Sequence, residues 1–110
     1  MITDTEVTKI CEYVRNNIQN KFSMKELEDL LGISARAIQY KFKKELNKTP
    51  FQYIEEQKLL KAFEMIQAYK REKTVTQVAE DLGLHHLGRF SIKFKKRFGL
   101  SPSNLARIKT

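Results

Sequence analysis

The stretch KFKKELNKTP, residues 41–50, recurs as KFKKRFGLSP, residues 93–102, with the first four residues and the final proline identical. The two stretches are 52 residues apart, whereas the glycines that precede them, Gly32 and Gly83, are 51 apart. A pattern repeated once within 110 residues indicates two similar small folds in one chain. The one-residue difference places an extra residue between the glycine and the lysine-rich stretch of the second copy.

Helix-start signals occur along the whole chain, and the strict apolar–polar alternation typical of strands is absent from the sequence. In a capping box, a hydroxyl and a carboxylate or amide three residues later satisfy unpaired backbone amides. The boxes are Thr3–Glu6, Ser23–Glu26, Thr49–Gln52 and Thr74–Gln77, and further predicted caps are Ser34, His86 and Ser101. We therefore predict an all-α fold of seven helices.

Apolar residues recur three or four positions apart after each start and define the predicted inward faces. In the first copy they are Val7, Ile10, Cys11, Val14 and Ile18, then Leu27, Leu30 and Leu31, then Ile38, Phe42 and Leu46. A longer helix starts at Pro50 and runs for roughly 19 residues, about 28 Å, with inward Phe51, Ile54, Leu59, Ala62, Phe63 and Ile66. The second copy has Val75, Val78, Ala79 and Leu82, then Phe90, Phe94 and Phe98. Helix ends in the left-handed conformation are predicted at Gly32, Asn47, Gly83 and Gly99.

Each copy thus consists of a capped short helix, a glycine, a short turn and a longer helix with a cationic end. This order is typical of the helix-turn-helix, in which the first helix supports the second and the second enters a groove of DNA. We predict two such subdomains, residues 1–48 and 70–110, joined by a linker helix at 49–69, with a charged loop at residues 69–73. A rigid spacer of about 28 Å suits two helices placed one DNA turn, roughly 34 Å, apart.

The charge balance favours a polyanionic partner. The chain has 21 Lys and Arg against 13 Asp and Glu, a net charge of +8, and no acidic residue follows Asp81. Nucleic acid and an anionic membrane surface both fit this balance. The lysine pairs Lys43–Lys44 and Lys95–Lys96 occupy equivalent places in the repeat, which predicts phosphate contacts, although a solvated basic face is the simpler alternative.

The outward faces of the two longer helices are the candidate base-reading surfaces. The first presents Arg36, Ala37, Gln39 and Tyr40; arginine can bind guanine and glutamine can bind adenine, while an ordinary polar face is the alternative. The second presents Leu87, Gly88, Arg89 and Ile92. An exposed helical glycine costs about 0.8 to 1 kcal/mol relative to alanine, so we interpret it as a place of close approach to DNA. Leu87 and Ile92 suit thymine methyl groups, a partner protein, or deeper burial.

Other chemistries lack candidates in the sequence. Cys11 is the only cysteine and lies on an apolar face, so we interpret it as a reduced core residue. His85 and His86 with Asp81 make a poor metal site, and capping by His86 is the preferred interpretation. No catalytic constellation, cofactor motif, signal peptide or membrane span is visible. We expect a cytoplasmic, nucleoid-associated protein that is not an enzyme.

The repeat resembles the DNA-binding domain of the AraC/XylS family of bacterial transcription regulators over nearly the whole chain. The first motif is matched by Leu27, Gly32, Ile33, Ser34, Arg36, Ile38 and Phe42, and the second, more specific one by Val78, Ala79, Gly83, Phe90, Ser91, Phe94, Phe98, Gly99, Ser101 and Pro102. Lys58–Leu59 and Ala62 fall where the linker helix of the family has Arg-Leu and Ala. Ile92 replaces a frequent arginine, and HHLGRF (85–90) replaces the commoner wording of that segment.

The resemblance implies sequence-specific binding of double-stranded DNA, with both longer helices in successive major grooves. It implies base contacts at residues 36, 37, 39 and 40 and at 87, 88, 89 and 92, and leaves base reading by the second set open because of the departures at Ile92 and in HHLGRF. We assign phosphate contacts to Ser34, Lys43, Lys44, His86, Lys95 and Lys96. It also implies a linked effector-binding or dimerisation domain. The alternative function is a protein-interaction module that docks on RNA polymerase or a partner domain.

Overall fold

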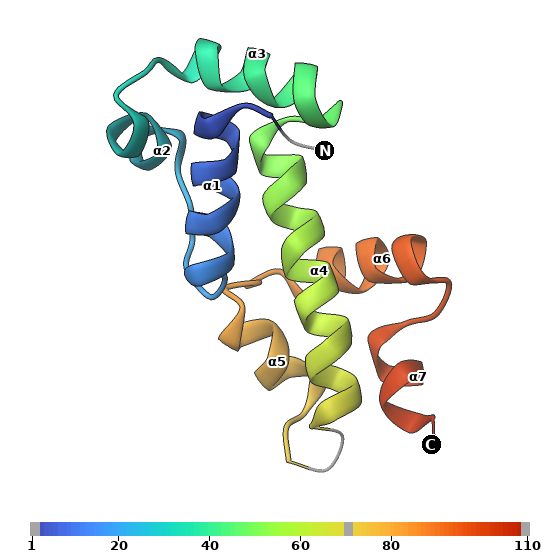
Figure 1. Cartoon of the computed structure of the whole chain (residues 1–110). Coiled ribbons are helices and arrows are strands. Elements are labelled where there is room, and N and C mark those ends of the chain that lie inside the picture. The colour runs from blue at the N-terminus through green and yellow to red at the C-terminus, as the bar shows by residue number, and fades with distance from the viewer. Residues whose placement is uncertain (1–2, 70–71, 109–110) are drawn as a thin grey trace. The chain divides into compact units, whose positions relative to one another are not determined.

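The computed structural model describes residues 3–69 and 72–108. Over these ranges it contains no strand and seven helices: α1 (Thr5–Asn16), α2 (Met24–Leu31), α3 (Ala35–Leu46), α4 (Pro50–Ala68), α5 (Val75–Asp81), α6 (Leu87–Phe98) and α7 (Pro102–Arg107) (Figure 1). The predicted all-α class and the number of helices are confirmed. None of the described helices is both long enough and apolar enough to cross a membrane.

The chain forms two compact units, residues 1–57 and 58–110, and the boundary between them lies inside α4. Each unit therefore includes part of the long helix. The finer division into 1–48, 49–69 and 70–110 stays a prediction. Of the charged loop predicted at residues 69–73, Lys70 and Arg71 lie outside the described residues.

The first unit packs α1, α2, α3 and the start of α4 around one apolar core. The buried residues of this core are Val7, Ile10, Cys11, Val14, Phe22, Leu27, Ile38, Phe42 and Ile54. The rings of Phe42 and Tyr53 pack in a T-shaped arrangement with their centroids 5.8 Å apart, which joins α3 to α4. Cys11 is buried and free, as predicted, and burial raises the pKa of its thiol. The core contacts α3 through the inner face of that helix, which carries Ile38 and Phe42.

The second unit is built around aromatic rings and packs α5, α6 and α7 against the later part of α4. Phe94 is fully buried, and its ring centroid lies 6.1 Å from that of Phe63 on α4 and 4.7 Å from that of Phe98. The other buried residues of this unit are Lys58, Leu59, Ala62, Ile66, Val78, Ala79, Leu82, Phe90, Pro102 and Leu105. Such ring pairs add to the burial of apolar area, so α6 is fixed mainly through its phenylalanines.

Most helix caps follow the predicted signals. Ser23, Ser34 and Ser101 each accept a hydrogen bond from the backbone amide three residues later. Reciprocal capping boxes are present at Thr49–Gln52 and Thr74–Gln77. Gly32, Asn47, Gly83 and Gly99 have positive φ angles, as predicted for helix ends. The turn between α5 and α6 is longer than the turn between α2 and α3, which confirms the place of the extra residue.

Three helix starts differ from the prediction in part. The cap of α1 is Asp4, whose carboxylate accepts from the amides of Glu6 and Val7, whereas the predicted cap, Thr3, donates its hydroxyl to Glu45. The carboxylate of Asp4 lies one residue nearer the helix, so it takes the amides instead. His86 occupies the predicted N-cap position of α6 but makes no side-chain cap hydrogen bond. The Ser23 box is half formed, because Glu26 accepts a hydrogen bond from the hydroxyl of Tyr13.

Two residues with predicted inward positions are exposed, and a third lies outside its predicted helix. Leu30 and Phe51 are each 43% exposed. Both are apolar neighbours of the residues that fill the core, and a helix of 3.6 residues per turn cannot turn all of them inward. Ile18 lies beyond the end of α1 at Asn16, although it still packs against the first core.

Candidate nucleic-acid interface

The first candidate surface is the outer face of α3. Gly32 ends α2 with φ 68°, a left-handed conformation that is costly for residues with a Cβ, and Ser34 then caps α3. Burial of Ile38 and Phe42 turns Arg36, Gln39 and Tyr40 to solvent, and Tyr40 is 68% exposed. Ala37 is only partly exposed. These three exposed side chains bring a guanidinium, an amide and a phenol together on the helix, the groups that hydrogen-bond to base edges.

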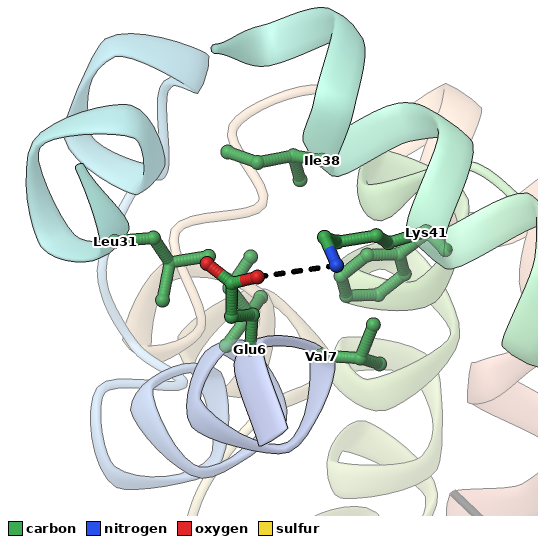
Figure 2. Close-up of a pocket in the computed structure, with 7 residues that line it drawn as sticks. Glu6, Val7, Leu31, Ile38 and Lys41 are labelled. Atoms are coloured by element: carbon green, nitrogen blue, oxygen red, sulfur yellow. Dashed lines mark ion pairs between the residues drawn. The ribbon is translucent and has the colours of Figure 1, made fainter. Parts of the chain in front are cut away.

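Acidic side chains at the start of α1 bind α3 on the side that faces away from the candidate surface. The Nζ of Lys41 lies 2.9 Å from Oδ2 of Asp4. It also lies 3.1 Å from Oε1 of Glu6, the ion pair drawn in Figure 2. Glu45 accepts from the backbone amide of Asp4, also at 2.9 Å. The hydrogen bond from Lys41 lowers the pKa of Asp4, and the same contact raises the pKa of Lys41. Lys41 is therefore bound within the protein.

The ion pairs of Lys41 with Asp4 and Glu6 were not predicted from the sequence. Lys41 and Asp4 are 37 residues apart, and no local spacing links them. Figure 2 shows Glu6 and Lys41 facing each other, with Val7, Leu31 and Ile38 around them. The hollow that these side chains line has no room even for a water molecule. The hollow between α1 and α3 is thus a shallow depression in packed side chains and offers no enclosed cavity for a small ligand.

The second candidate surface is the outer face of α6. Phe90 and Phe94 are buried, and this turns Leu87, Gly88, Arg89 and Ile92 outward. Leu87 is 39% exposed and Ile92 is 71% exposed. The alternative of deeper burial for these two residues is therefore wrong. Of these four residues only Arg89 has a side chain that can donate a hydrogen bond to a base.

The two lysine pairs lie at the same place on each of these helices. Lys43 and Lys44 are exposed in the last turn of α3, and Lys95 and Lys96 are exposed in the last turn of α6. Cations there also interact favourably with the partial negative charge of the helix end, so the position alone does not define a phosphate site. Ser34 is exposed as well, and its hydroxyl oxygen accepts the cap hydrogen bond from Ala37.

Lys58 is a buried charged residue. The sequence indicated only that it matches a position of the family's linker helix, and its burial was not predicted. Its side chain on α4 is 7% exposed, and its Nζ donates to the carbonyl of Leu82, 2.5 Å away. Leu82 is the C-cap of α5, so Lys58 binds the backbone where the turn into α6 begins. Desolvation by burial lowers the pKa of Lys58 from 10.5 to about 8.

The histidines near the second turn have no metal-binding neighbours in the described part of the chain. His85 and His86 are exposed, and Asp81 forms an ion pair with Lys73. No group of three or more His, Cys, Asp or Glu side chains that could hold an ion occurs among the described residues. Nothing in this region assembles the ligands that a metal requires.

Two units of this kind, each with an outward-facing second helix, define a helix-turn-helix protein. A family model described as "Helix-turn-helix domain" matches residues 27–108, which include α3 and α6. With its curated relatives and structural neighbours, the chain belongs to the AraC/XylS family of bacterial transcription regulators, whose members bind DNA and are not enzymes. The family resemblance in the repeated motifs is thereby confirmed.

The chain is 32% identical over 101 residues to XylDLEGF operon transcriptional activator 2 of Pseudomonas putida, covering 87% of this chain and 62% of the relative. It is 30% identical over 104 residues to XylDLEGF operon transcriptional activator of the same species, covering 90% of this chain and 31% of that protein. The chain thus spans from under a third to just under two thirds of the length of these relatives.

Solved structures agree on the fold. A structure described as "a probable AraC family transcriptional regulator" from Rhodopseudomonas palustris superimposes with a TM-score of 0.88 at 26% identity, covering 94% of this chain and 96% of that one. The structure of the "xylose-binding transcription activator xylR" gives 0.83 at 24% identity, covering 98% of this chain and 28% of that one. At this lower identity the second match supports the fold alone.

Proposed function

We propose that this chain binds a specific sequence of double-stranded DNA, with α3 and α6 in successive major grooves. The observation that carries the proposal is common to both units: apolar residues fix the inner face of the second helix, while its outer face stays in solvent. The base-reading residues would be Arg36, Ala37, Gln39 and Tyr40, and Leu87, Gly88, Arg89 and Ile92. The exposed lysine pairs and the net charge of +8 support phosphate contact.

The phosphate contacts of this proposal involve six residues with different roles. Lys43, Lys44, Lys95 and Lys96 would neutralise phosphates. Ser34 and His86 stand at the N-cap positions of α3 and α6, where helix amides favour anions. The subdomains 1–48 and 70–110 would each bring one helix to the duplex, with residues 49–69 as the linker. A linked effector-binding or dimerisation domain and control of an operon, as in the named relatives, remain proposals for the whole regulator.

The test is fluorescence anisotropy with labelled duplexes at several salt concentrations. Neutralising phosphates releases counterions, so the affinity should fall steeply as salt increases. Selection of bound duplexes from a random pool should then yield a site long enough for two grooves, about 20 base pairs. A flat salt response would exclude phosphate binding, and a pool without enrichment would exclude sequence specificity.

A second candidate function rests on the exposure of Leu87 and Ile92. Two apolar side chains in solvent on one helix also suit a protein partner, and we consider docking on RNA polymerase as the alternative. Selective NMR shifts of Leu87 and Ile92 on adding polymerase subunits, without shifts on adding DNA, would favour it over DNA binding.

A further inference from the structure

The net positive charge of the chain belongs entirely to one of its two units. Residues 1–57 contain nine acidic and nine basic side chains, whereas residues 58–110 contain four acidic and twelve basic ones. The first unit is therefore neutral, and the second carries the whole +8. Association with DNA of any sequence depends on such charge, so the two units are unequal partners for a polyanion.

The same inequality holds for the two candidate helices. α6 has five basic residues, Arg89, Lys93, Lys95, Lys96 and Arg97, and no acidic one. α3 has four basic residues and also Glu45. The structure reduces the charge of α3 further, because Asp4 and Glu6 both lie on Lys41.

Hydrogen-bonding capacity is distributed in the opposite way. The outer face of α3 offers Arg36, Gln39 and Tyr40, all exposed, whereas that of α6 offers Arg89 between the apolar Leu87 and Ile92. Phosphate contacts carry no sequence information, and base edges are discriminated mainly by hydrogen bonds. The unit with the charge is thus the one with little means to read bases, and the unit with the reading groups is neutral.

Given the proposed function, on which this step rests, we infer that the second unit alone holds the protein on DNA of arbitrary sequence, and that the first unit engages only at a matching site. The second unit supplies the affinity that is common to all sequences. The first supplies most of the discrimination among them. Lys43 and Lys44 contact phosphates in the specific complex, where Arg36 and its neighbours have base partners that hold α3 in the groove.

The experiment compares lysine pairs that occupy equivalent places in the repeat. Two double variants, Lys95→Ala with Lys96→Ala and Lys43→Ala with Lys44→Ala, are titrated with a scrambled-sequence duplex and with a selected duplex over a range of salt. Each lost phosphate contact lowers the slope of log affinity against log salt by about 0.9, which at 0.1 M salt amounts to roughly 60-fold for two contacts. All four lysines are exposed, so melting followed by circular dichroism should confirm an intact fold.

On the scrambled duplex, loss of Lys95 and Lys96 should lower the slope by about two units and loss of Lys43 and Lys44 by less than one. On the selected duplex both variants should lower it by about two. A third variant, Lys21→Ala with Lys25→Ala, removes the same charge from exposed positions of the first unit outside the proposed interface, and separates net charge from local contact.

Equal changes for both repeat pairs on the scrambled duplex, or none for Lys95 and Lys96, would overturn the division between the units while leaving DNA binding intact. An equal loss with the Lys21 and Lys25 variant would also overturn it, because net charge alone would then set the slope. If the unaltered chain shows no salt-dependent affinity for either duplex, the proposed function itself fails.

Discussion

Lys41 on α3 donates a hydrogen bond of 2.9 Å to Asp4, the residue that caps α1. One carboxylate group thus caps the start of α1 and also binds the helix that we propose to enter the groove. Its two oxygens divide the work, because Oδ1 accepts from the amides of Glu6 and Val7 while Oδ2 accepts from Lys41. The orientation of α3 is therefore coupled to the start of α1.

Lys41→Met should raise the pKa of Asp4 toward its ordinary value of 3.8. The folded-state pKa is lowered chiefly by the hydrogen bond from Lys41, so this contact stabilises the fold above pH 3.8 and the benefit is lost as pH falls through the lower folded value. Titration of the carboxyl carbon by NMR measures the change. Lys43→Met, at an exposed position away from Asp4, is the control, and an equal shift in both variants would contradict the assignment.

Lys58→Met should remove a pH dependence of stability at alkaline pH. The pKa of Lys58 in the folded state is about 8 against 10.5 for the unfolded chain, so the unfolded state binds more protons between these values and stability rises with pH there. Above pH 10.5 Lys58 is neutral in both states, and its burial then carries no charge penalty. This gain in stability is lost as pH falls through 8, where the buried amine becomes charged. Urea unfolding at pH 7 and pH 10.5 should show the native chain gaining up to about 3 kcal/mol relative to the variant. If the free energy of unfolding changed equally with pH in both proteins, Lys58 would not be desolvated.

Gly88→Ala should stabilise the protein and weaken its binding to DNA. Apart from its chain neighbours and the backbone of its own helix, no atom lies within 4 Å of the place where a Cβ would stand, and the residue is in the first turn of α6. Restricting the unfolded chain should add about 0.4 to 1 kcal/mol, visible as a higher melting temperature. If DNA approaches Gly88 closely, affinity should fall in the same variant. A melting gain with unchanged affinity would place the DNA elsewhere.

Arg36→Ala and Lys95→Ala should affect binding in different ways. Loss of a guanidinium that binds a base should cost roughly 1 to 3 kcal/mol on the selected site and relax the preference at one position. Loss of Lys95 should weaken all sequences alike. Competition between selected and scrambled duplexes measures both effects. If both variants lose affinity uniformly, Arg36 contacts phosphate and not a base.

Phe94→Ala should destabilise the protein by about 3 to 5 kcal/mol, the usual cost of emptying a buried phenylalanine site. Phe94 is fully buried between Phe63, Phe90 and Phe98. Phe51→Ala is the contrast, because that ring is 43% exposed and should cost well under this. Chemical unfolding of both variants tests the burial pattern. Equal losses would show that Phe51 is part of the core.

The sequence was informative wherever the interaction is local. The hydroxyl oxygens of Ser34 and Thr74 accept hydrogen bonds from backbone amides three residues later, so these caps could be predicted from the adjacent sequence. The outward position of Tyr40 followed in the same way from the spacing of Ile38 and Phe42. Adjacent candidates such as Thr3 and Asp4 could not be separated, because both side chains can reach the same amides.

The contacts that fix the candidate surfaces were not predictable in this way. Lys41 meets Asp4 across 37 residues, and Lys58 meets Leu82 across 24. These distances in sequence are bridged only once the cores have formed. Apolar periodicity likewise placed Leu30 inward, since it shows which face is apolar but not how much of that face is covered.

Asn47 ends α3 with φ 55° and Pro50 begins α4 three residues later; Gly99 and Pro102 do the same after α6. Both helix ends are fixed by the backbone conformation, so binding to a partner cannot lengthen either helix. A protein built in this way can acquire a new target only by exchanging side chains along a helix of constant reach. Changes of specificity are thereby confined to a handful of positions, and the scaffold beneath them need not change at all.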